Sequence, residues 1–458
     1  MLVIHVDNFF NLCYNSYIGL KFCKTKRFNY FMKTKNQQIS IFDSLNDKSL
    51  NDNYISPYSY IGDKTINELF SFYNKLNNDT SHYTCRDDMC TPMECVELMV
   101  NYIPTEFWER ETIKILDPCC GNGNFGAYCA KKTHPDNIYY NDINPIRLKN
   151  CISLLQPKHW RLGDAFVLDN DFDIKYDLII TNPPYSGGGN KNQSLSNLFI
   201  ELAIDRLNER GYLCFITPNN WMSYNNKNTT LKKLLNEGSF IVIDNDVKKY
   251  FKNIGSSFTV FVWQKGIFNK TKVINNYIIK DIQESVIIPK TMKFIPLYLS
   301  QEIISITNKL ISDERNLFNY RCDLHNFTKK AHLSDVKDLK FKYKTIHTPK
   351  KTRFADIKQD IYDKWIIVVP LSTYYKPYIE HNVNTTQSVG YFCFDNPFYA
   401  EKYLKKITQK HFKLLIHLTR YGNFNNLMVL KHINFDKKLI FSNKELAEIE
   451  KLTAFIKY

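Results

Sequence analysis

The sequence lacks the features that mark membrane proteins and disulfide-rich secreted domains. No uninterrupted apolar run approaches the ~18 residues that a membrane-spanning helix requires, and the N-terminal segment, with several Asn and an Asp, makes a poor signal peptide. The 12 cysteines show neither a disulfide framework nor the short paired spacing of a zinc site, since Cys119 and Cys120 are adjacent while Cys85, Cys90 and Cys95 recur at equal intervals. We therefore expect free thiols in the cytoplasm, no metal and no membrane contact.

Length and charge indicate a chain of two or three domains with one basic half. A chain of 458 residues is long enough to form two or three domains, each with its own hydrophobic core. Residues 1–265 carry 29 Lys and Arg against 28 Asp and Glu, whereas residues 266–458 carry 32 against 18. Positive charge concentrated in one half is typical of a protein that binds a phosphate backbone. The alternative is a generic solvated surface rich in lysine.

Short apolar runs alternate with helical patterns between about residues 83 and 265, as in a parallel α/β sheet. The expected strands are 113–116, 138–141, 176–181, 212–216, 240–243 and 258–263, and the expected helices are 125–132, 145–155, 197–209 and 231–236. After a linker rich in Asn and Lys (268–276), strands at 365–369 and 389–394 mix with a helix at 400–414. We expect a weakly ordered extension (1–55), an α/β domain (56–267) and a mixed α+β domain (268–458).

A glycine-rich turn follows the first expected strand. In the stretch Leu116 to Phe125, Gly121 and Gly123 would let the backbone approach a ligand closely, and the next helix offers free N–H groups at its N-terminus. Some twenty residues on, Asp142 ends the next strand, where an acidic side chain commonly accepts hydrogen bonds from ribose hydroxyls. Alternatively, Asp142 caps the helix that begins at Pro145.

A second acidic turn, Gly163-Asp164-Ala165-Phe166, follows a short third strand. Its carboxylate could accept a hydrogen bond from an adenine amine, and Phe166 could supply an apolar contact. Taken alone, such a turn is a common structural element, so it carries weight only beside the other motifs.

The most informative motif is Asn182-Pro183-Pro184-Tyr185, directly after the apolar run 178–180. An exocyclic base amine is a poor nucleophile because its lone pair is delocalised into the ring. A carboxamide oxygen and a backbone carbonyl that accept the two amine protons would localise that lone pair. Pro183 has no N–H to donate, and two prolines hold the carbonyls in an extended array. Tyr185 can stack on a base flipped out of a duplex. The alternative is a rigid strand-to-loop turn.

Residues 84–265 resemble the catalytic domain of the gamma-class (TaqI-type) adenine-N6 DNA methyltransferases of the restriction–modification methylase family. The motifs that carry the resemblance follow that family's order: Thr91-Pro92-Met93-Glu94, Asp117 to Phe125, Asp142, Asp164-Ala165-Phe166 and Asn182 to Tyr185. The resemblance implies a Rossmann-like fold, with a mostly parallel sheet and an antiparallel last strand. It also implies transfer of a methyl group from S-adenosyl-L-methionine to the N6 amine of a flipped adenine in double-stranded DNA.

The same resemblance assigns roles to individual residues. It implies that the cofactor is bound by Thr91, Pro92, Asp117, Pro118, Gly121, Gly123, Phe125, Asp142, Asp164, Ala165 and Phe166. Within that set, Thr91 and Pro92 would hold its methionine part, Asp142 its ribose, and Asp164 with Phe166 its adenine. The target amine and base would be bound by Asn182, Pro183, Pro184 and Tyr185.

The family also has a second aromatic residue near the last strand of the domain, which stacks on the other face of the flipped base. We expect Trp263 in that position, with Phe258 and Phe261 as competitors. Alternating aromatics on a strand are more often part of a core, so a purely structural Trp263 is the alternative.

The C-terminal half resembles, more loosely, the recognition region of restriction–modification methylases. The similarity lies in Gly390-Tyr391-Phe392, 400–404, 411–415 and the ending 433–450, although Phe441 stands near a place where a tryptophan is frequent. We expect this half to bind DNA and the chain to be a monomer. The sequence leaves open whether a cognate restriction endonuclease is a partner. The alternatives are methylation of an RNA base or a protein glutamine, because Asn-Pro-Pro-Tyr also occurs in such enzymes, and a non-catalytic DNA-binding protein that keeps the fold.

Overall fold

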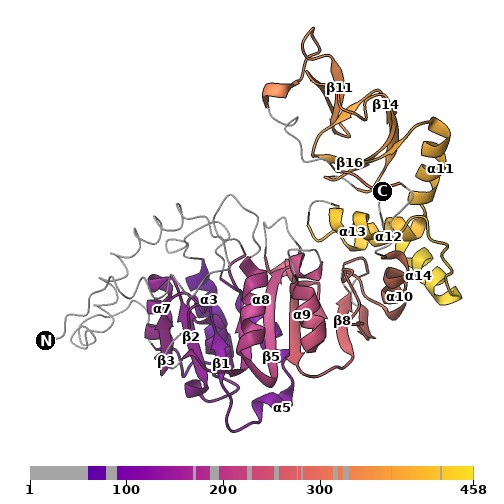
Figure 1. Cartoon of the computed structure of the whole chain (residues 1–458). Coiled ribbons are helices and arrows are strands. Elements are labelled where there is room, and N and C mark those ends of the chain that lie inside the picture. The colour runs from indigo at the N-terminus through magenta and orange to yellow at the C-terminus, as the bar shows by residue number, and fades with distance from the viewer. Residues whose placement is uncertain are drawn as a thin grey trace. The chain divides into compact units, whose positions relative to one another are not determined.

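The first region of the chain is built on a sheet of nine described strands (Figure 1). The structure is a computed structural model that describes residues 60–78, 90–168, 172–185, 195–223, 229–251, 257–275, 277–279, 282–312, 318–322, 330–372, 374–422 and 425–456. The segment 1–55, for which the sequence predicts a weakly ordered extension, lies outside these residues.

The strand order of this sheet is β3-β2-β1-β4-β5-β7-β6-β8-β9. The strands are β1 (Ile115–Asp117), β2 (Ile138–Asp142), β3 (His159–Leu162), β4 (Tyr176–Thr181), β5 (Leu207–Pro218), β6 (Gly238–Asp244), β7 (Phe258–Lys265), β8 (Thr271–Asn275) and β9 (Ile282–Val286). Strands β3, β2, β1, β4 and β5 pair in parallel, and β7 runs antiparallel to both β5 and β6. The expected mostly parallel Rossmann-like sheet is therefore confirmed, and β7, the last strand that the sequence predicts for it, is antiparallel, although β8 and β9 follow.

Helices cover the sheet through two sets of contacts. Helix α4 packs on β5 and on α3 and α6, while α8 packs on β5 and α9 on β6. The elements of this region are α3 (Ile66–Asn77), α4 (Met93–Asn101), α5 (Thr105–Trp108), α6 (Asn124–Cys129), α7 (Pro145–Leu155), α8 (Leu195–Arg206) and α9 (Thr230–Glu237), with short 3₁₀ turns at Pro135–Asn137, Asn219–Met222 and Val247–Tyr250. The bounds of α7 and β4 coincide with the ranges expected from the sequence.

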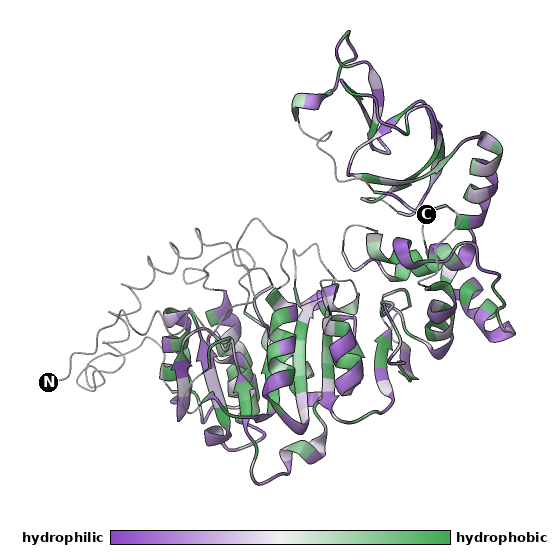
Figure 2. Cartoon of the chain, in the orientation of Figure 1, coloured by the Kyte–Doolittle hydropathy of each residue, from purple (hydrophilic) through white to green (hydrophobic). Residues whose placement is uncertain are grey.

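The period-2 alternation of a strand divides the core between the two faces of the sheet. On β5, Leu213 and Phe215 belong to the cluster that includes residues of α8 and α9, whereas the Cys214 thiol contacts the backbone carbonyl of Met99 on α4. Both faces are covered, so the central strands are hydrophobic along almost their whole length (Figure 2).

The sheet continues beyond residue 267, where the sequence places the boundary between the two domains. The stretch expected to be a polar linker contains β8, which pairs in parallel with β6. Its polar residue Asn275 is fully buried, and its side-chain amide donates to the carbonyl of Leu299 (2.8 Å) while its oxygen accepts from the N–H of Leu299 (2.9 Å). A hydrogen-bonded Asn can therefore occupy a buried strand position that composition alone marks as a loop.

The second region mixes two small sheets with helices, as expected. One sheet has the described strands β10-β12-β11-β15 and the other β14-β13-β16. The elements are α10 (Gln301–Leu310), β10 (Leu333–Ser334), β11 (Tyr343–Thr348), β12 (Lys351–Ala355), β13 (Trp365–Pro370), β14 (Tyr378–His381), β15 (Asn384–Thr385), β16 (Val389–Phe394), α11 (Pro397–Ile407), α12 (Lys410–Leu418), α13 (Leu427–His432) and α14 (Asn443–Thr453), with a 3₁₀ turn at Lys330–His332.

The single helix expected at 400–414 is two helices, α11 and α12. The break lies at Thr408, whose hydroxyl donates back to the carbonyl of Leu404 (2.7 Å), and at Gln409, whose backbone is extended (ψ 149°). The two helices serve different partners, because α11 packs on β13 and β16 while α12 packs on α10 and α14. The apolar spacing continues across the break, so it did not reveal the turn.

Candidate active site

The glycine turn after β1 needs glycine at two positions for different reasons. Gly121 and Gly123 have positive φ angles of 55° and 87°, which L side chains rarely adopt. In addition, a Cβ on Gly123 would lie 2.7 Å from Leu155 Cδ1 and 2.9 Å from Cys151 Sγ, both on α7. The turn is thus held tightly against α7, and its backbone forms part of the surface at the carboxyl ends of β1 and β2.

Asp142 lies at the end of β2 and holds this turn. Its Oδ2 accepts the N–H of Gly121 (2.7 Å) and its Oδ1 accepts the N–H of Asn144 (2.7 Å). The cap of α7 is Asn144, whose side chain accepts from the N–H groups of Ile146 and Arg147. Asn144, and not Asp142, is therefore the N-cap of α7.

Asn141 is a structural residue that the motif analysis missed. Its side-chain amide donates to the carbonyls of Pro118 (2.9 Å) and Gly163 (3.1 Å), and its oxygen accepts from Arg161 (2.8 Å). Arg161 also donates to the carbonyl of Val167 (2.6 Å). Asn141 thereby joins the loops that follow β1 and β3 across the end of β2. Its only sequence signal is its place beside Asp142, at the end of a strand that is otherwise apolar.

Asp117 is almost completely buried at the end of β1. Burial raises the pKa of Asp117 to about 8, although the Thr181 hydroxyl and the N–H of Cys119 act in the opposite direction. Its Oδ1 accepts that N–H at 3.3 Å. The carboxyl group is therefore mostly protonated at pH 7, and it organises the interior of the turn rather than presenting a negative charge to a ligand. Phe125 is likewise buried, in the first turn of α6.

The turn after β3 brings the next set of predicted residues to the same edge of the sheet. Asp164 Oδ1 accepts the N–H of Phe166 (3.0 Å), which fixes the local turn. Ala165 is buried, while the half-buried Phe166 ring packs against Phe199 with ring centroids 4.7 Å apart. Because β1, β2 and β3 are parallel neighbours, Asp117, Asp142 and Asp164 all lie at the carboxyl edge of the sheet.

Asn182, directly after β4, has a carboxamide whose two ends contact different partners. Its Nδ2 donates to Thr91 Oγ1 (3.1 Å), and its Oδ1 accepts the hydroxyl of Tyr185 (2.5 Å). The carbonyl of Thr91 in turn accepts from the Asn124 side chain (2.9 Å). Thr91 therefore connects the helix that follows the glycine turn to the Asn-Pro-Pro-Tyr motif, in addition to preceding Pro92, the N-cap residue of α4.

The remaining residues of the motif differ in exposure. Pro183 is buried and Pro184 is exposed. The Tyr185 ring lies 5.1 Å from the Phe258 ring, centroid to centroid, at an angle of 53°. Burial raises the pKa of Tyr185 above its ordinary value, so the hydroxyl stays protonated and donates to Asn182.

The prediction that Trp263 stacks on a flipped base does not fit the structure. Trp263 is fully buried, its indole N–H donates to the carbonyl of Leu234 (2.9 Å) on α9, and it is part of the core. The cause is the direction of β7. An antiparallel strand begins at the edge where its parallel neighbours end, so Phe258 lies at the edge that carries Asn182. Trp263 lies five residues, about 17 Å, further along.

The state of the cysteines, the presence of metal sites and the presence of membrane spans can be stated for the described residues. Their cysteines are free thiols. Within the described ranges, no group of three or more His, Cys, Asp or Glu side chains is placed to hold a metal ion. No helix in this part of the chain is both long and apolar enough to cross a membrane.

Comparison with known proteins points to one family. Residues 125–251 match the model of the Eco57I restriction-modification methylase family. This segment is similar to that family, and the match covers less than half of the chain. The Eco57I-family segment includes β2 to β6 and, with them, Asp142, Asp164 and the Asn-Pro-Pro-Tyr motif. The resemblance to restriction–modification methylases is therefore confirmed for this part of the chain.

Individual relatives match part of the chain. The chain is 30% identical over 150 residues to the type II methyltransferase M.VspI of Vibrio sp. (strain 343), covering 28% of this chain and 35% of that protein. It is 28% identical over 131 residues to the ribosomal RNA small subunit methyltransferase C of Psychromonas ingrahamii, covering 28% and 36%. The chain thus matches only about a third of the length of these relatives.

A solved structure extends the similarity of fold beyond the Eco57I-family segment. The type IIL restriction-modification enzyme MmeI, in complex with DNA, matches with a TM-score of 0.54 at 11% sequence identity. The match covers 85% of this chain and 68% of the MmeI chain. At this identity the match establishes a common fold alone.

Proposed function

We propose that the chain is a DNA methyltransferase that transfers a methyl group from S-adenosyl-L-methionine to the N6 amine of adenine in duplex DNA. The observation that carries this proposal is the orientation of the Asn182 carboxamide. The Asn182 Nδ2 group donates a hydrogen bond to Thr91 Oγ1, so the Asn182 oxygen points the other way. That oxygen accepts the hydroxyl of Tyr185, whose ring lies beside the Phe258 ring. An oxygen fixed beside aromatic rings suits an amine carried on a planar base.

The residues at the carboxyl edge fit S-adenosylmethionine by the chemistry of their donors and acceptors. The Asp142 carboxylate accepts two backbone N–H groups, and an ionised carboxylate is the kind of acceptor to which ribose hydroxyls donate. Asp164 and the half-buried Phe166 ring offer an acceptor and an apolar surface to an adenine. When bound, the cofactor would supply a methyl group already activated on a sulfonium.

On the target side, the chain positions the amine and favours its reactive form. Asn182 Oδ1, which accepts the Tyr185 hydroxyl in this structure, would accept one amine proton, and the backbone carbonyl of Pro183 would accept the other. Two acceptors favour a tetrahedral nitrogen with a localised lone pair. A nitrogen held in this way would take the methyl group that the bound cofactor supplies, leaving S-adenosylhomocysteine, and would release one proton to solvent. Positioning and electrostatics account for such catalysis.

We propose that Tyr185 and Phe258 enclose the target base, in place of the predicted pair of Tyr185 and Trp263. Both rings lie at the edge of the sheet that carries Asn182. With centroids 5.1 Å apart, the rings are already in contact. A base can therefore enter between them only if Tyr185 moves away from Phe258, which would also change its hydrogen bond to Asn182.

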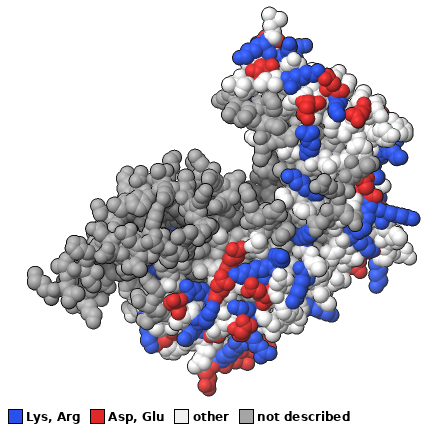
Figure 3. Space-filling view, in the orientation of Figure 1, with Lys and Arg blue, Asp and Glu red and all other residues white. Residues whose placement is uncertain are grey.

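We assign DNA binding mainly to residues 268–458. Three observations support this: the excess of 32 basic over 18 acidic residues from 266 onward, the mixed α+β architecture of that region, and the common fold with MmeI, a protein solved with DNA. On the face shown in Figure 3, Lys and Arg side chains are spread over this region with Asp and Glu among them. Ion pairs such as Lys406–Asp436 and Lys410–Glu450 join some of these opposite charges.

RNA is the second candidate substrate, because the ribosomal RNA methyltransferase of Psychromonas ingrahamii matches 28% of this chain. The two candidates can be separated by offering a radiolabelled methyl donor with duplex DNA, single-stranded DNA, ribosomal RNA and a protein extract in parallel. We expect label in duplex DNA, recovered after digestion as N6-methyladenine, and none with Asn182→Ala. Label found in RNA or in protein glutamine instead would overturn the proposal.

A further inference from the structure

A single carboxamide joins the two chain neighbours of Phe258, the ring that we propose as one wall of the target-base site. Asn219 lies directly after β5 and is almost completely buried. Its Nδ2 donates to Ser257 Oγ (3.1 Å), and its Oδ1 accepts the hydroxyl of Thr259 (2.6 Å). Ser257 and Thr259 are the residues immediately before and after Phe258. Asn219 therefore forms a clamp across the segment that carries the Phe258 ring.

The Phe258 ring also has a fixed aromatic partner. It is buried, and it stacks on the Phe251 ring with centroids 5.6 Å apart and an angle of 27°. Its place in the sheet is set as well, since Phe258 pairs with Pro218 in the antiparallel ladder between β5 and β7. Tyr185, by contrast, is joined to Asn182 by a hydrogen bond between side chains. Phe258 is therefore held more firmly than Tyr185.

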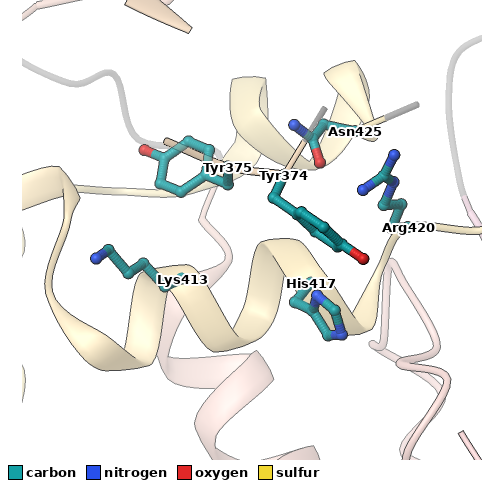
Figure 4. Close-up of a pocket in the computed structure, with 6 residues that line it drawn as sticks. All are labelled: Tyr374, Tyr375, Lys413, His417, Arg420 and Asn425. Atoms are coloured by element: carbon teal, nitrogen blue, oxygen red, sulfur yellow. The ribbon is translucent and has the colours of Figure 1, made fainter. Parts of the chain in front are cut away.

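The Asn219 clamp is connected to the part of the chain to which we assign DNA binding. The Ser257 hydroxyl donates to the backbone carbonyl of Tyr421 (2.5 Å), and Tyr421 is part of the core cluster of the catalytic sheet. Tyr421 comes directly after Arg420, whose guanidinium lies 5.3 Å from the centre of the Tyr374 ring (Figure 4). The position of Phe258 is therefore tied to the segment that follows α12.

The row of hydrogen-bonding groups that contains the clamp has one proton too few. Four side chains connect two backbone carbonyls in this row, in the order Leu297 carbonyl, Asn245, Thr259, Asn219, Ser257 and Tyr421 carbonyl. Each hydroxyl has a single proton, and each amide donates at one end and accepts at the other. Because the carbonyls at both ends only accept, the protons have to point outward at both ends. One contact inside the row is then left with two acceptors.

This shortage limits how much Asn219 contributes to stability. It is visible at Thr259, whose hydroxyl contacts an amide oxygen on each side at 2.6 Å and has one proton for both. Without the Asn219 side chain the row would separate into two shorter rows, in which every contact has its proton. A buried contact between two acceptors costs free energy. The clamp therefore stabilises the fold less than an ordinary buried carboxamide does, and its main effect is on the position of the residues that it joins.

We infer that Asn219 is a positioning residue that holds Phe258 in place for stacking on the flipped base. This inference rests on the proposed function, in which Phe258 and Tyr185 enclose that base. Stacking requires a ring at a defined distance and angle from the base. A ring that is already held in place also loses less conformational freedom when the base arrives. Asn219 thus acts on the base through Phe258.

The test compares Asn219→Ala with the wild-type chain on two duplexes. Both contain the methylated site, mapped by sequencing DNA from cells that express the chain, and one has a mismatch at the target adenine. On the paired duplex, with cofactor and DNA saturating, we expect Asn219→Ala to methylate about fivefold more slowly, the low end of what one base–aromatic stack contributes. On the mismatched duplex the difference should shrink, because flipping costs less there. The brightening of 2-aminopurine at the target position should follow the same pattern.

Asn275→Ala is the matched control, because Asn275 is also a buried carboxamide but binds both backbone groups of Leu299. It should lower the unfolding temperature more than Asn219→Ala does, since it leaves those two groups without partners. Its rates on the two duplexes should stay at the wild-type level. Cofactor affinity should be unchanged in both variants. A misfolded Asn219→Ala would be replaced by Ser257→Ala, which removes one arm of the clamp and should show the same dependence on the mismatch.

The outcomes separate this inference from the proposed function. If the wild-type protein methylates adenine in both duplexes and Asn219→Ala does so at the same rates, the inference is wrong and the proposed function stands. An equal loss of rate on both duplexes would also contradict the inference, because a general structural defect does not depend on the pairing of the target base. If the wild-type protein methylates neither duplex, both proposals fall together.

Discussion

The two halves of the candidate site are built differently. On the cofactor side, Asp142 and Asn141 bind backbone groups, so their positions depend on the fold of three loops. On the target side, Asn182 contacts Thr91 and Tyr185, and Tyr185 contacts Phe258, from side chain to side chain. A side chain can leave such a contact without moving the backbone. The cofactor side is therefore formed before binding, while the target side has to rearrange when a base enters.

The largest expected effect is on the rate of methyl transfer, with cofactor affinity unchanged. Asn182→Ala should lower kcat by ~10²–10³, because it removes a hydrogen-bond acceptor that acts on the reacting amine, while the affinity for S-adenosylmethionine stays close to wild type. Single-turnover methylation and calorimetry measure the two quantities. Asn208→Ala, which removes an amide bonded to Asp177, is the control and should leave both unchanged. Near-normal turnover of Asn182→Ala would reject the assigned role.

The opposite pattern is expected on the cofactor side. Asp142→Ala should weaken cofactor binding by about 1.5–3 kcal/mol, the usual range for hydrogen bonds to a charged group, and should reduce kcat much less once cofactor is saturating. Calorimetry and a cofactor titration of the rate measure this. Asp136→Ala, at an exposed ion pair with Lys158, provides the control. Equal losses of kcat and affinity in Asp142→Ala would contradict the separation of the two halves.

Stacking on the target base should give an intermediate effect. Tyr185→Ala should weaken binding to a duplex with a mismatch at the target adenine by roughly 1–3 kcal/mol, the value of one base–aromatic stack. Tyr185→Phe keeps the ring and loses only the hydrogen bond to Asn182, so it should lose much less. Fluorescence of 2-aminopurine at the target position reports flipping in the same samples. If both variants bind like wild type, the ring does not contact the base.

The smallest effect on activity is expected at Trp263. Trp263→Phe should lower the free energy of unfolding by about 1–3 kcal/mol, because it leaves the buried carbonyl of Leu234 without its donor, yet methylation should stay within a factor of about two. Phe258→Leu should weaken methylation strongly, in addition to a loss of stability of its own, because Phe258 is also buried. Denaturant titrations measure the stability of the two variants, and steady-state rates measure their methylation activity. A large loss of activity in Trp263→Phe with unchanged stability would restore the original expectation.

The sequence predicted what depends on local order along the chain. The apolar runs located β4 and α7 within a residue, and the motifs placed Asp142, Asp164 and Asn182 at strand ends, which parallel pairing then brings to one edge. It failed where the answer depends on direction or on distant partners. The choice of Trp263 over Phe258 required the antiparallel direction of β7, and the bond between Asn182 and Thr91 joins residues that no spacing rule connects. Asn275 looked like part of a linker because its partner, Leu299, lies in a later segment.

The action of Asn182 on an adenine amine in DNA can be tested on the nucleosides themselves. DNA from cells that express the wild-type chain, and from cells that express Asn182→Ala, would be digested to nucleosides and analysed by mass spectrometry. We expect N6-methyladenine above the background of the host with the wild-type chain, and background levels with Asn182→Ala although the variant still binds the cofactor. Methylation of cytosine instead, or N6-methyladenine that is equally abundant in both samples, would contradict it.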